Sequence, residues 1–176
     1  MAARRPADIV ARVSVDEAEF RRAVGRFATG VTVVATLHDG AEHAMTVNSF
    51  TSVSLTPVLV LVCVEKVARL HEPLLASAVW SVSVLGVDHR SAGEWFATRG
   101  RPEDHRLVGY RTRPGPVTGS PVFVDALAAL ECRTWARYDG GDHTIVVGEV
   151  AWVDPGSGDG RPLIYYGGEY GELPAG

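Results

Sequence analysis

Alternating apolar and polar residues predict a chain built mainly of strands. Residues 29–36 (TGVTVVAT) are β-branched and apolar, and residues 80–85 (WSVSVL) alternate strictly, as a strand with one buried face does. Residues 58–64 (VLVLVCV) form a valine-rich run too short to span a membrane, which predicts a central strand buried on both faces. Two longer strands are expected at 127–138 and 143–153, and LIYY near the C-terminus predicts a short last one.

Turn residues indicate how these strands are connected. His-Asp-Gly at 38–40 separates the first strand from a second segment at 42–49, and Asp-Gly-Gly-Asp at 139–142 separates the two long strands. Both sequences are typical of tight hairpin turns, so each pair is expected to be antiparallel.

Helical signals occur at the start and in the middle of the chain. Ser14 followed by Glu17 resembles a capping box, and apolar residues then recur at helical spacing, which predicts a helix over 15–28. These apolar residues are Phe20, Val24 and Phe27. Pro73 suits the first turn of a helix that ends at residue 78.

A third helix is predicted over 88–97, with Trp95 and Phe96 packing inward. Residues 98–120 are rich in Arg, Pro and Gly and predict a long surface excursion. The order of elements lacks a βαβ rhythm. It favours a mainly β fold with helical decoration, an antiparallel barrel that is closed or partly closed.

Composition limits the size and the partners of this fold. With 176 residues, 46% of them hydrophobic, we expect a single domain over 1–176 in which residues 1–14 form a flexible arm. The 17 basic and 21 acidic residues are scattered, so neither nucleic acid nor a membrane surface is an expected partner. The chain has no run of about 18 apolar residues, and we expect a soluble cytoplasmic protein with a small ligand. Heavy use of Arg and Ala suggests a GC-rich bacterial source.

Several common catalytic motifs are missing from the sequence. It contains no GxSxG, GxxxxGK[ST] or HExxH motif, and GSGDG at 156–160 lies between predicted strands, where a plain turn is expected. Cys63 and Cys132 each lie in an apolar run, as buried free thiols do, and the six histidines form no pair at metal-binding spacing. We therefore predict no metal site, and hydrolase, kinase and zinc-protease functions lose their usual support.

A dense group of short polar side chains directly precedes the valine-rich strand. Its members are Thr46, Asn48, Ser49, Thr51, Ser52 and Ser54. The polar edge of a flavin ring needs hydroxyl, amide and backbone partners of this kind, while the ring faces need apolar cover. A Ser/Thr-rich barrel strand facing solvent fits the same residues equally well.

Four segments together resemble a known family. They are FRRAVGRFATGVTVVAT, AMTVNSFTSVS followed by LTPVLVLVCV, LAALECRTWARYDGGDHTIVVGEV and PLIYYGGEY. In this order, over about residues 20–170, the sequence resembles the flavin reductase family of split-barrel FMN-binding proteins, which are reductase components of two-component flavin-dependent monooxygenases. The resemblance implies an antiparallel split β-barrel, a homodimer, and reduced flavin passed to a separate oxygenase.

The resemblance also implies a site for FAD or FMN and for NADH or NADPH. Hydride would pass from nicotinamide C4 to flavin N5, and no protein residue would act as a catalytic acid, base or nucleophile. Arg69 would bind the flavin phosphate, and His143 of the GDH motif would lie beside the nicotinamide. The implied cofactor-binding residues are Met45, Thr46, Val47, Asn48, Ser49, Ser52, Ser54, Cys63, Val64, Glu65, Arg69 and Phe96.

The chain departs from the family pattern at the phosphate end of this site. Ala68 and Leu70 flank Arg69 where the family commonly has hydroxyl residues, which leaves the choice between FMN and FAD open. Ser83 and Leu107 replace a usual asparagine and a usual aromatic residue. Two other functions stay open: a flavin-binding electron carrier or oxidase with tightly held flavin, and a non-enzymatic small-molecule-binding barrel.

Overall fold

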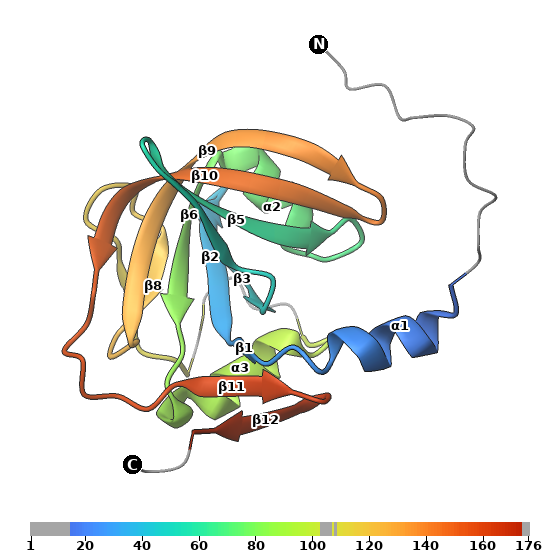
Figure 1. Cartoon of the computed structure of the whole chain (residues 1–176). Helices are drawn as coiled ribbons and strands as arrows, with labels where there is room; N and C mark the ends of the chain where they lie inside the picture. The colour runs from blue at the N-terminus through green and yellow to red at the C-terminus, as the bar shows by residue number, and fades with distance from the viewer. Residues whose placement is uncertain (1–14, 103–106, 108, 174–176) are drawn as a thin grey trace.

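The computed structural model describes residues 15–102, 107 and 109–173, and its elements are mostly antiparallel strands (Figure 1). The helices are α1 (Glu17–Val24), α2 (His71–Ser77) and α3 (Arg90–Ala97), the last preceded by the 3₁₀ turn η1 (Val87–His89). The strands are β1 (Thr29–Gly30), β2 (Thr32–His38), β3 (Ala41–Val47), β4 (Thr51–Leu55), β5 (Val58–Glu65), β6 (Val79–Val84), β7 (Thr112–Pro114), β8 (Pro121–Phe123), β9 (Ala128–Gly140), β10 (His143–Asp154), β11 (Leu163–Tyr166) and β12 (Glu169–Glu172).

Seven strands form the main sheet, in the order β3-β2-β6-β9-β10-β5-β4. Every pairing within it is antiparallel. β3 lies at one edge, yet it also approaches β5 near the opposite edge, so the sheet curls back on itself (Figure 1). The predicted mainly β, antiparallel architecture is confirmed. β1, β11 and β12 form a small second sheet, and β7 pairs with β8.

Both predicted hairpins are present, and the backbone explains why their turn residues are needed. Asp39 and Gly40 link β2 to β3 with φ values of 49° and 74°. Two successive positive φ angles are typical of the type I′ turn that matches strand twist. Gly141 has a φ of 83° in the turn between β9 and β10.

β5 differs from its prediction. It lies between β10 and the edge strand β4, so it is not central, and only alternate residues are fully buried. Val60, Val62 and Val64 face the core, whereas Cys63 and Glu65 lie on a half-buried face. That face remains open because it borders a cavity, described below. The predicted strand order has no separate β4, but the solvent-facing alternative for the polar segment holds there, because residues 51–53 are exposed on this edge strand.

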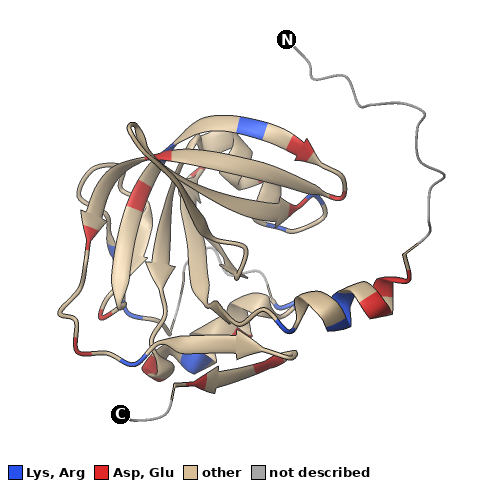
Figure 2. Ribbon diagram, in the orientation of Figure 1, with Lys and Arg blue, Asp and Glu red and all other residues tan. Residues whose placement is uncertain are grey.

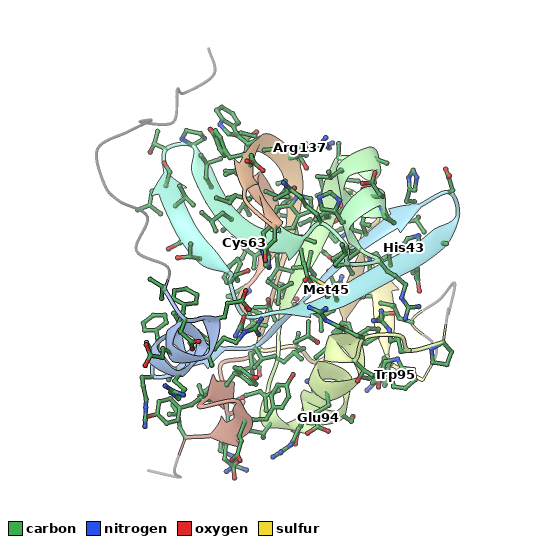
Figure 3. All side chains as sticks on the ribbon, turned by 90° about the vertical axis from the view of Figure 1, so that its right-hand side faces the viewer. His43, Met45, Cys63, Glu94, Trp95 and Arg137 are labelled. Carbon is green, nitrogen blue, oxygen red and sulfur yellow. The ribbon has the colours of Figure 1, made fainter. Side chains whose placement is uncertain are left out.

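Two groups of apolar side chains form the core. One lies between α2 and the curled sheet and contains Val62, Leu74 and the fully buried Trp80. The other lies under α3 and β11 and contains Phe96 and Leu163. The prediction that Phe96 packs inward is therefore confirmed. The same prediction for Trp95 is wrong, because Trp95 projects from the other side of the helix and is 38% exposed (Figure 3).

α1 is shorter than predicted and starts differently. It spans Glu17–Val24, and the Asp16 carboxylate caps it by accepting a 2.9 Å hydrogen bond from the Glu19 N–H. Ser14 of the predicted capping box lies outside the described residues, as does the predicted arm at 1–14. The apolar residues Phe20, Val24 and Phe27 are all exposed, Phe27 at 77%.

Charged residues of both signs are interspersed over the described ribbon, without a continuous basic stripe (Figure 2). Within that part of the chain, no helix is long and apolar enough to cross a membrane. The same residues include no cluster of three or more His, Cys, Asp or Glu side chains that could hold a metal ion.

Candidate functional site

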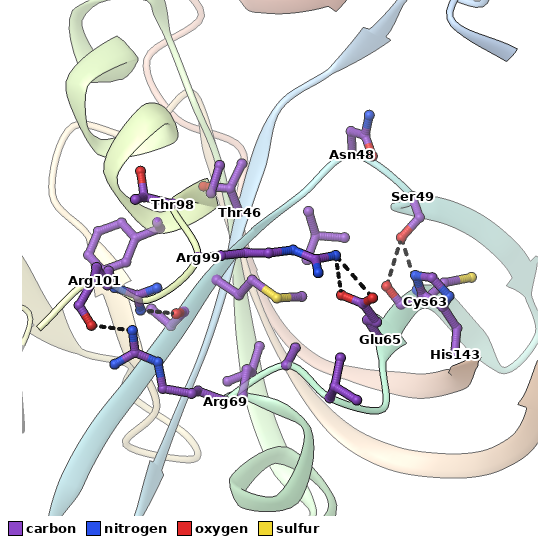
Figure 4. A pocket seen from close by; sticks show the side chains of 18 of the residues that line it. Thr46, Asn48, Ser49, Cys63, Glu65, Arg69, Thr98, Arg99, Arg101 and His143 are labelled. Carbon is purple, nitrogen blue, oxygen red and sulfur yellow. Dashed lines mark hydrogen bonds and ion pairs between the residues drawn. The ribbon is translucent and has the colours of Figure 1, made fainter. Parts of the chain in front are cut away.

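A cavity of about 410 Å³ lies where β3, the end of β5 and the segment after α3 meet. Its volume is in the range typical of small-molecule sites. Ten predicted cofactor or nicotinamide residues line it, and eight of them are labelled in the close-up or the whole-molecule view (Figures 3 and 4). The ten residues are Met45, Thr46, Val47, Asn48, Ser49, Cys63, Glu65, Arg69, Phe96 and His143.

Three predicted cofactor-binding residues do not line this cavity. Val64 is fully buried and belongs to the core on the opposite face of β5. Ser52 is exposed on β4, and the hydroxyl of Ser54 accepts a 3.2 Å hydrogen bond from the Thr56 N–H at the end of that strand. The polar segment 45–54 therefore divides, because residues 45–49 line the cavity whereas residues 51–54 belong to β4, which pairs with β5 at the edge of the sheet.

Two hydroxyl groups of the polar segment hold the walls of the cavity together. Thr46 Oγ1 donates a 2.7 Å hydrogen bond to the Gly93 carbonyl oxygen, which fixes α3 against β3. Ser49 Oγ accepts a hydrogen bond of 2.9 Å from the Cys63 N–H and donates one of 3.2 Å to the Cys63 carbonyl oxygen (Figure 4). These bonds hold residues 45–49, called the polar shelf below, rigidly in place. The alternative of a strand whose hydroxyl groups face solvent does not hold at Thr46 and Ser49, because both side chains are partly buried.

The opposite wall of the cavity is basic. Arg69 follows β5, whereas Arg99 and Arg101 follow α3, and all three line the cavity (Figure 4). Arg69 donates a hydrogen bond to the Arg101 carbonyl oxygen. Arg101 in turn donates one of 2.6 Å to the Ala44 carbonyl oxygen, and its guanidinium lies 5.1 Å from the centre of the Phe96 ring.

The sequence prediction missed Arg99 and Arg101, because it assigned residues 98–120 to a surface excursion. The closely spaced arginines in Arg-Gly-Arg at 99–101, directly after the predicted helix, were the signal available. Arg99 reaches across the cavity from α3 toward β5 (Figure 4). Its Nη2 lies 2.7 Å and 3.0 Å from the two carboxylate oxygens of Glu65.

His143 begins β10, and its ladder partner on β5 is Glu65. Its Nδ1 lies 2.7 Å from Oδ1 of Asp142. An ionised carboxylate can only accept, so Nδ1–H is the donor, and this hydrogen bond lowers the pKa of Asp142 below its ordinary value. The interaction fixes one edge of the imidazole and leaves Nε2 available to a ligand in the cavity.

Comparison with known proteins identifies the family. A model of the flavin reductase like domain matches residues 24–174. The chain belongs to the flavin reductase family. It is 44% identical over 138 residues to an NADH-dependent FAD reductase of Streptomyces globisporus, an alignment that covers 77% of this chain and 74% of that protein.

Other flavin reductase relatives match over a greater share of the chain. The reductase component of a 4-nitrophenol 4-monooxygenase/4-nitrocatechol 2-monooxygenase from Rhodococcus opacus is 37% identical over 159 residues, covering 90% of this chain and 82% of that one. The fold is also similar to the crystal structure of BorF, the flavin reductase component of a bacterial two-component tryptophan halogenase, with a TM-score of 0.83 and 41% sequence identity. The superposition covers 91% of this chain and 99% of the BorF chain. These matches confirm the predicted split-barrel fold class.

The cavity has the groups that a flavin needs. Met45, Val47 and Phe96 offer apolar cover, the backbone and side chains of 46–49 offer short polar partners, and the basic wall suits a phosphate. Ala68 and Leu70 also line the cavity and bring no polar side-chain group beside Arg69. The donors available to a phosphate are therefore concentrated on the arginines.

Proposed function

We propose that this member of the flavin reductase family oxidises NADH, reduces FAD or FMN, and supplies the reduced flavin to a separate monooxygenase. The observation that carries the proposal is the single cavity that joins the polar shelf at 45–49, Arg69 and His143 from three separate parts of the chain. Relatives named as NADH-dependent flavin reductases and as monooxygenase reductase components support each part of it.

The chemistry of the bound pair is a hydride transfer from the nicotinamide to the flavin ring. The residues of the chain bind and orient. Met45 and Val47 cover apolar surface, Thr46 and Ser49 keep the shelf rigid through their backbone hydrogen bonds, and Arg69 neutralises phosphate charge. His143, held by Asp142, positions the carboxamide or ribose of NADH through Nε2.

The proposal includes a homodimer. α1 exposes Phe20 and Val24, and the turn after it exposes Phe27. A second cavity of about 890 Å³ lies between this region and residues 48–51. Asn48 and Ser49 border both cavities, so a second copy packed on α1 would lie next to the flavin site. Location in the cytoplasm, where NADH is supplied, stays a prediction.

The direct test follows NADH and NADPH absorbance with purified protein and added FMN, FAD or riboflavin. We expect NADH oxidation that depends on added flavin, together with weak flavin retention during purification. Firmly bound flavin without NADH oxidation would favour an electron carrier or oxidase instead. Failure to bind any flavin would favour a non-enzymatic binding barrel.

A further inference from the structure

We propose that Arg99 is the residue that selects phosphorylated flavins, by exchanging its contact with the Glu65 carboxylate for one with the ligand phosphate. The inference rests on the proposed function, since it concerns ligand choice at the same site. Arg69 was the residue expected to bind the flavin phosphate, and Arg99 is a different residue with the additional role of selecting the ligand.

The geometry of the ion pair supports this exchange. Arg99 comes from the segment after α3 and Glu65 from the end of β5, so the pair spans the cavity from one wall to the other (Figure 4). A single nitrogen, Nη2, lies within 3.0 Å of both carboxylate oxygens. Guanidinium groups bind carboxylate and phosphate oxygens alike, so a phosphate that enters the cavity can take the place of the Glu65 carboxylate at Arg99.

The three arginines of the cavity differ in what holds their side chains. Arg69 and Arg101 donate hydrogen bonds to the carbonyl oxygens of Arg101 and Ala44, which belong to the backbone of the cavity wall. Arg99 instead contacts a side chain that can rotate away. The Arg99 side chain is 81% exposed and that of Glu65 27%, and ion pairs this exposed are weak. A doubly charged phosphate therefore competes well with the single carboxylate charge for Arg99.

The charge of the cavity also favours an anionic ligand. Its lining has three arginines against one acidic residue, Glu65, although the chain as a whole has a formal charge of −4. Pairing with Glu65 masks the Arg99 charge while no anion is present. Because Ala68 and Leu70 add no hydrogen-bond donor at Arg69, a phosphate in this cavity gains most from a second guanidinium.

The test compares FMN with riboflavin, which differ only in the phosphate. Affinities are measured by flavin fluorescence for the wild-type protein and for the variants Arg99→Met and Glu65→Gln. We expect Arg99→Met to weaken FMN binding about tenfold, as the loss of a charge-assisted hydrogen bond does, with riboflavin affinity unchanged. Glu65→Gln removes the competing carboxylate and should raise the affinity for FMN several-fold relative to the affinity for riboflavin.

Arg90→Met is the matched control, because Arg90 is also on α3 and pairs with Glu94 away from the cavity. It should leave both affinities unchanged. The inference would be overturned if Arg99→Met still binds flavin and has the same ratio of FMN to riboflavin affinity as the wild-type protein. Weaker FMN binding in Glu65→Gln would also overturn it, because Glu65 would then hold Arg99 in place for the ligand. Wild-type protein that binds no flavin would overturn the proposed function and this inference together.

Discussion

Lys66 Nζ donates a 2.6 Å hydrogen bond to the carbonyl oxygen of Gly141, which joins the segment after β5 to the turn between β9 and β10. The same ammonium group lies 2.6 Å from Oδ1 of Asp139, and the Lys66 N–H donates to the Asp142 carbonyl oxygen. His143 follows this turn directly. Lys66, the single lysine of the chain, therefore fixes the turn that presents the proposed nicotinamide-binding residue.

Replacing Lys66 by Met should raise the KM for NADH about two- to fivefold and leave flavin affinity unchanged. Lys66 is partly exposed, and interactions of this kind contribute roughly 0.5–1 kcal/mol. Steady-state NADH oxidation measures the effect. Lys66→Arg should restore most of the wild-type KM, and Arg111→Met, which removes a distant exposed charge, is the control. A Lys66→Met protein with the wild-type KM would contradict this role.

The contact between Asp142 and His143 should also be visible in a titration. The pKa of the Asp142 carboxyl lies below its ordinary value of 3.8, mainly because of the hydrogen bond from His143. Stabilisation by this contact is therefore present above that ordinary value and is lost as the pH falls through the lowered pKa. In His143→Ala, carboxyl NMR should show the Asp142 pKa rising toward 3.8, and kinetics should show weaker NADH use with nearly normal flavin binding. Equal losses of NADH use and flavin binding would count against the nicotinamide assignment.

The two cysteines should differ in reactivity toward iodoacetamide. Burial raises the pKa of the Cys132 thiol to about 12, so almost no thiolate forms near pH 8. Cys63 lines the cavity and is only partly buried. Mass spectrometry should therefore find Cys63 labelled first and protected by added flavin, with Cys132 labelled only after unfolding. Equal labelling of both thiols in the folded protein would contradict this expectation.

Glu131 should be essential for stability. It is fully buried on β9, and its carboxylate accepts hydrogen bonds from the Val117 N–H, the Thr118 N–H and the Thr118 hydroxyl. Glu131→Ala leaves these donors unpaired, and we expect it to lower the free energy of unfolding by about 3 kcal/mol. Urea denaturation measures the change. Glu172→Ala, which removes an exposed carboxylate, should change it little, and similar stability of the two variants would refute the assignment.

The exposed apolar residues of α1 and of the turn after it should determine the oligomeric state. Light scattering during gel filtration is expected to give the mass of a dimer for the wild-type protein. A Phe20→Glu, Phe27→Glu double variant should be a monomer, because two charges would be buried in the contact. Val117→Ser, which alters an exposed apolar residue elsewhere, should stay dimeric. A monomeric wild-type protein would contradict the proposed homodimer.

The strand pattern and both hairpins could be predicted because they depend on local chemistry. Alternation fixes which face of a strand is buried, and Asp39-Gly40 adopts positive φ angles more readily than most residue pairs. The sequence left open whether residues 51–54 face solvent on a strand, because an edge strand such as β4 needs little apolar character to distinguish it from a polar binding segment. The inward packing of Trp95 was wrong because helical spacing alone does not say which side of α3 meets the sheet.

The sequence by itself determined the mainly β antiparallel fold, the family resemblance, and the grouping of Met45, Thr46 and Ser49 close together in one polar segment. Short-range periodicity and contiguous motifs carry that information. Only the tertiary structure decided that Arg99 meets Glu65 across the cavity, because residues 34 positions apart come into contact only when the sheet curls and α3 packs against β3. Sequence spacing does not encode contacts of that range.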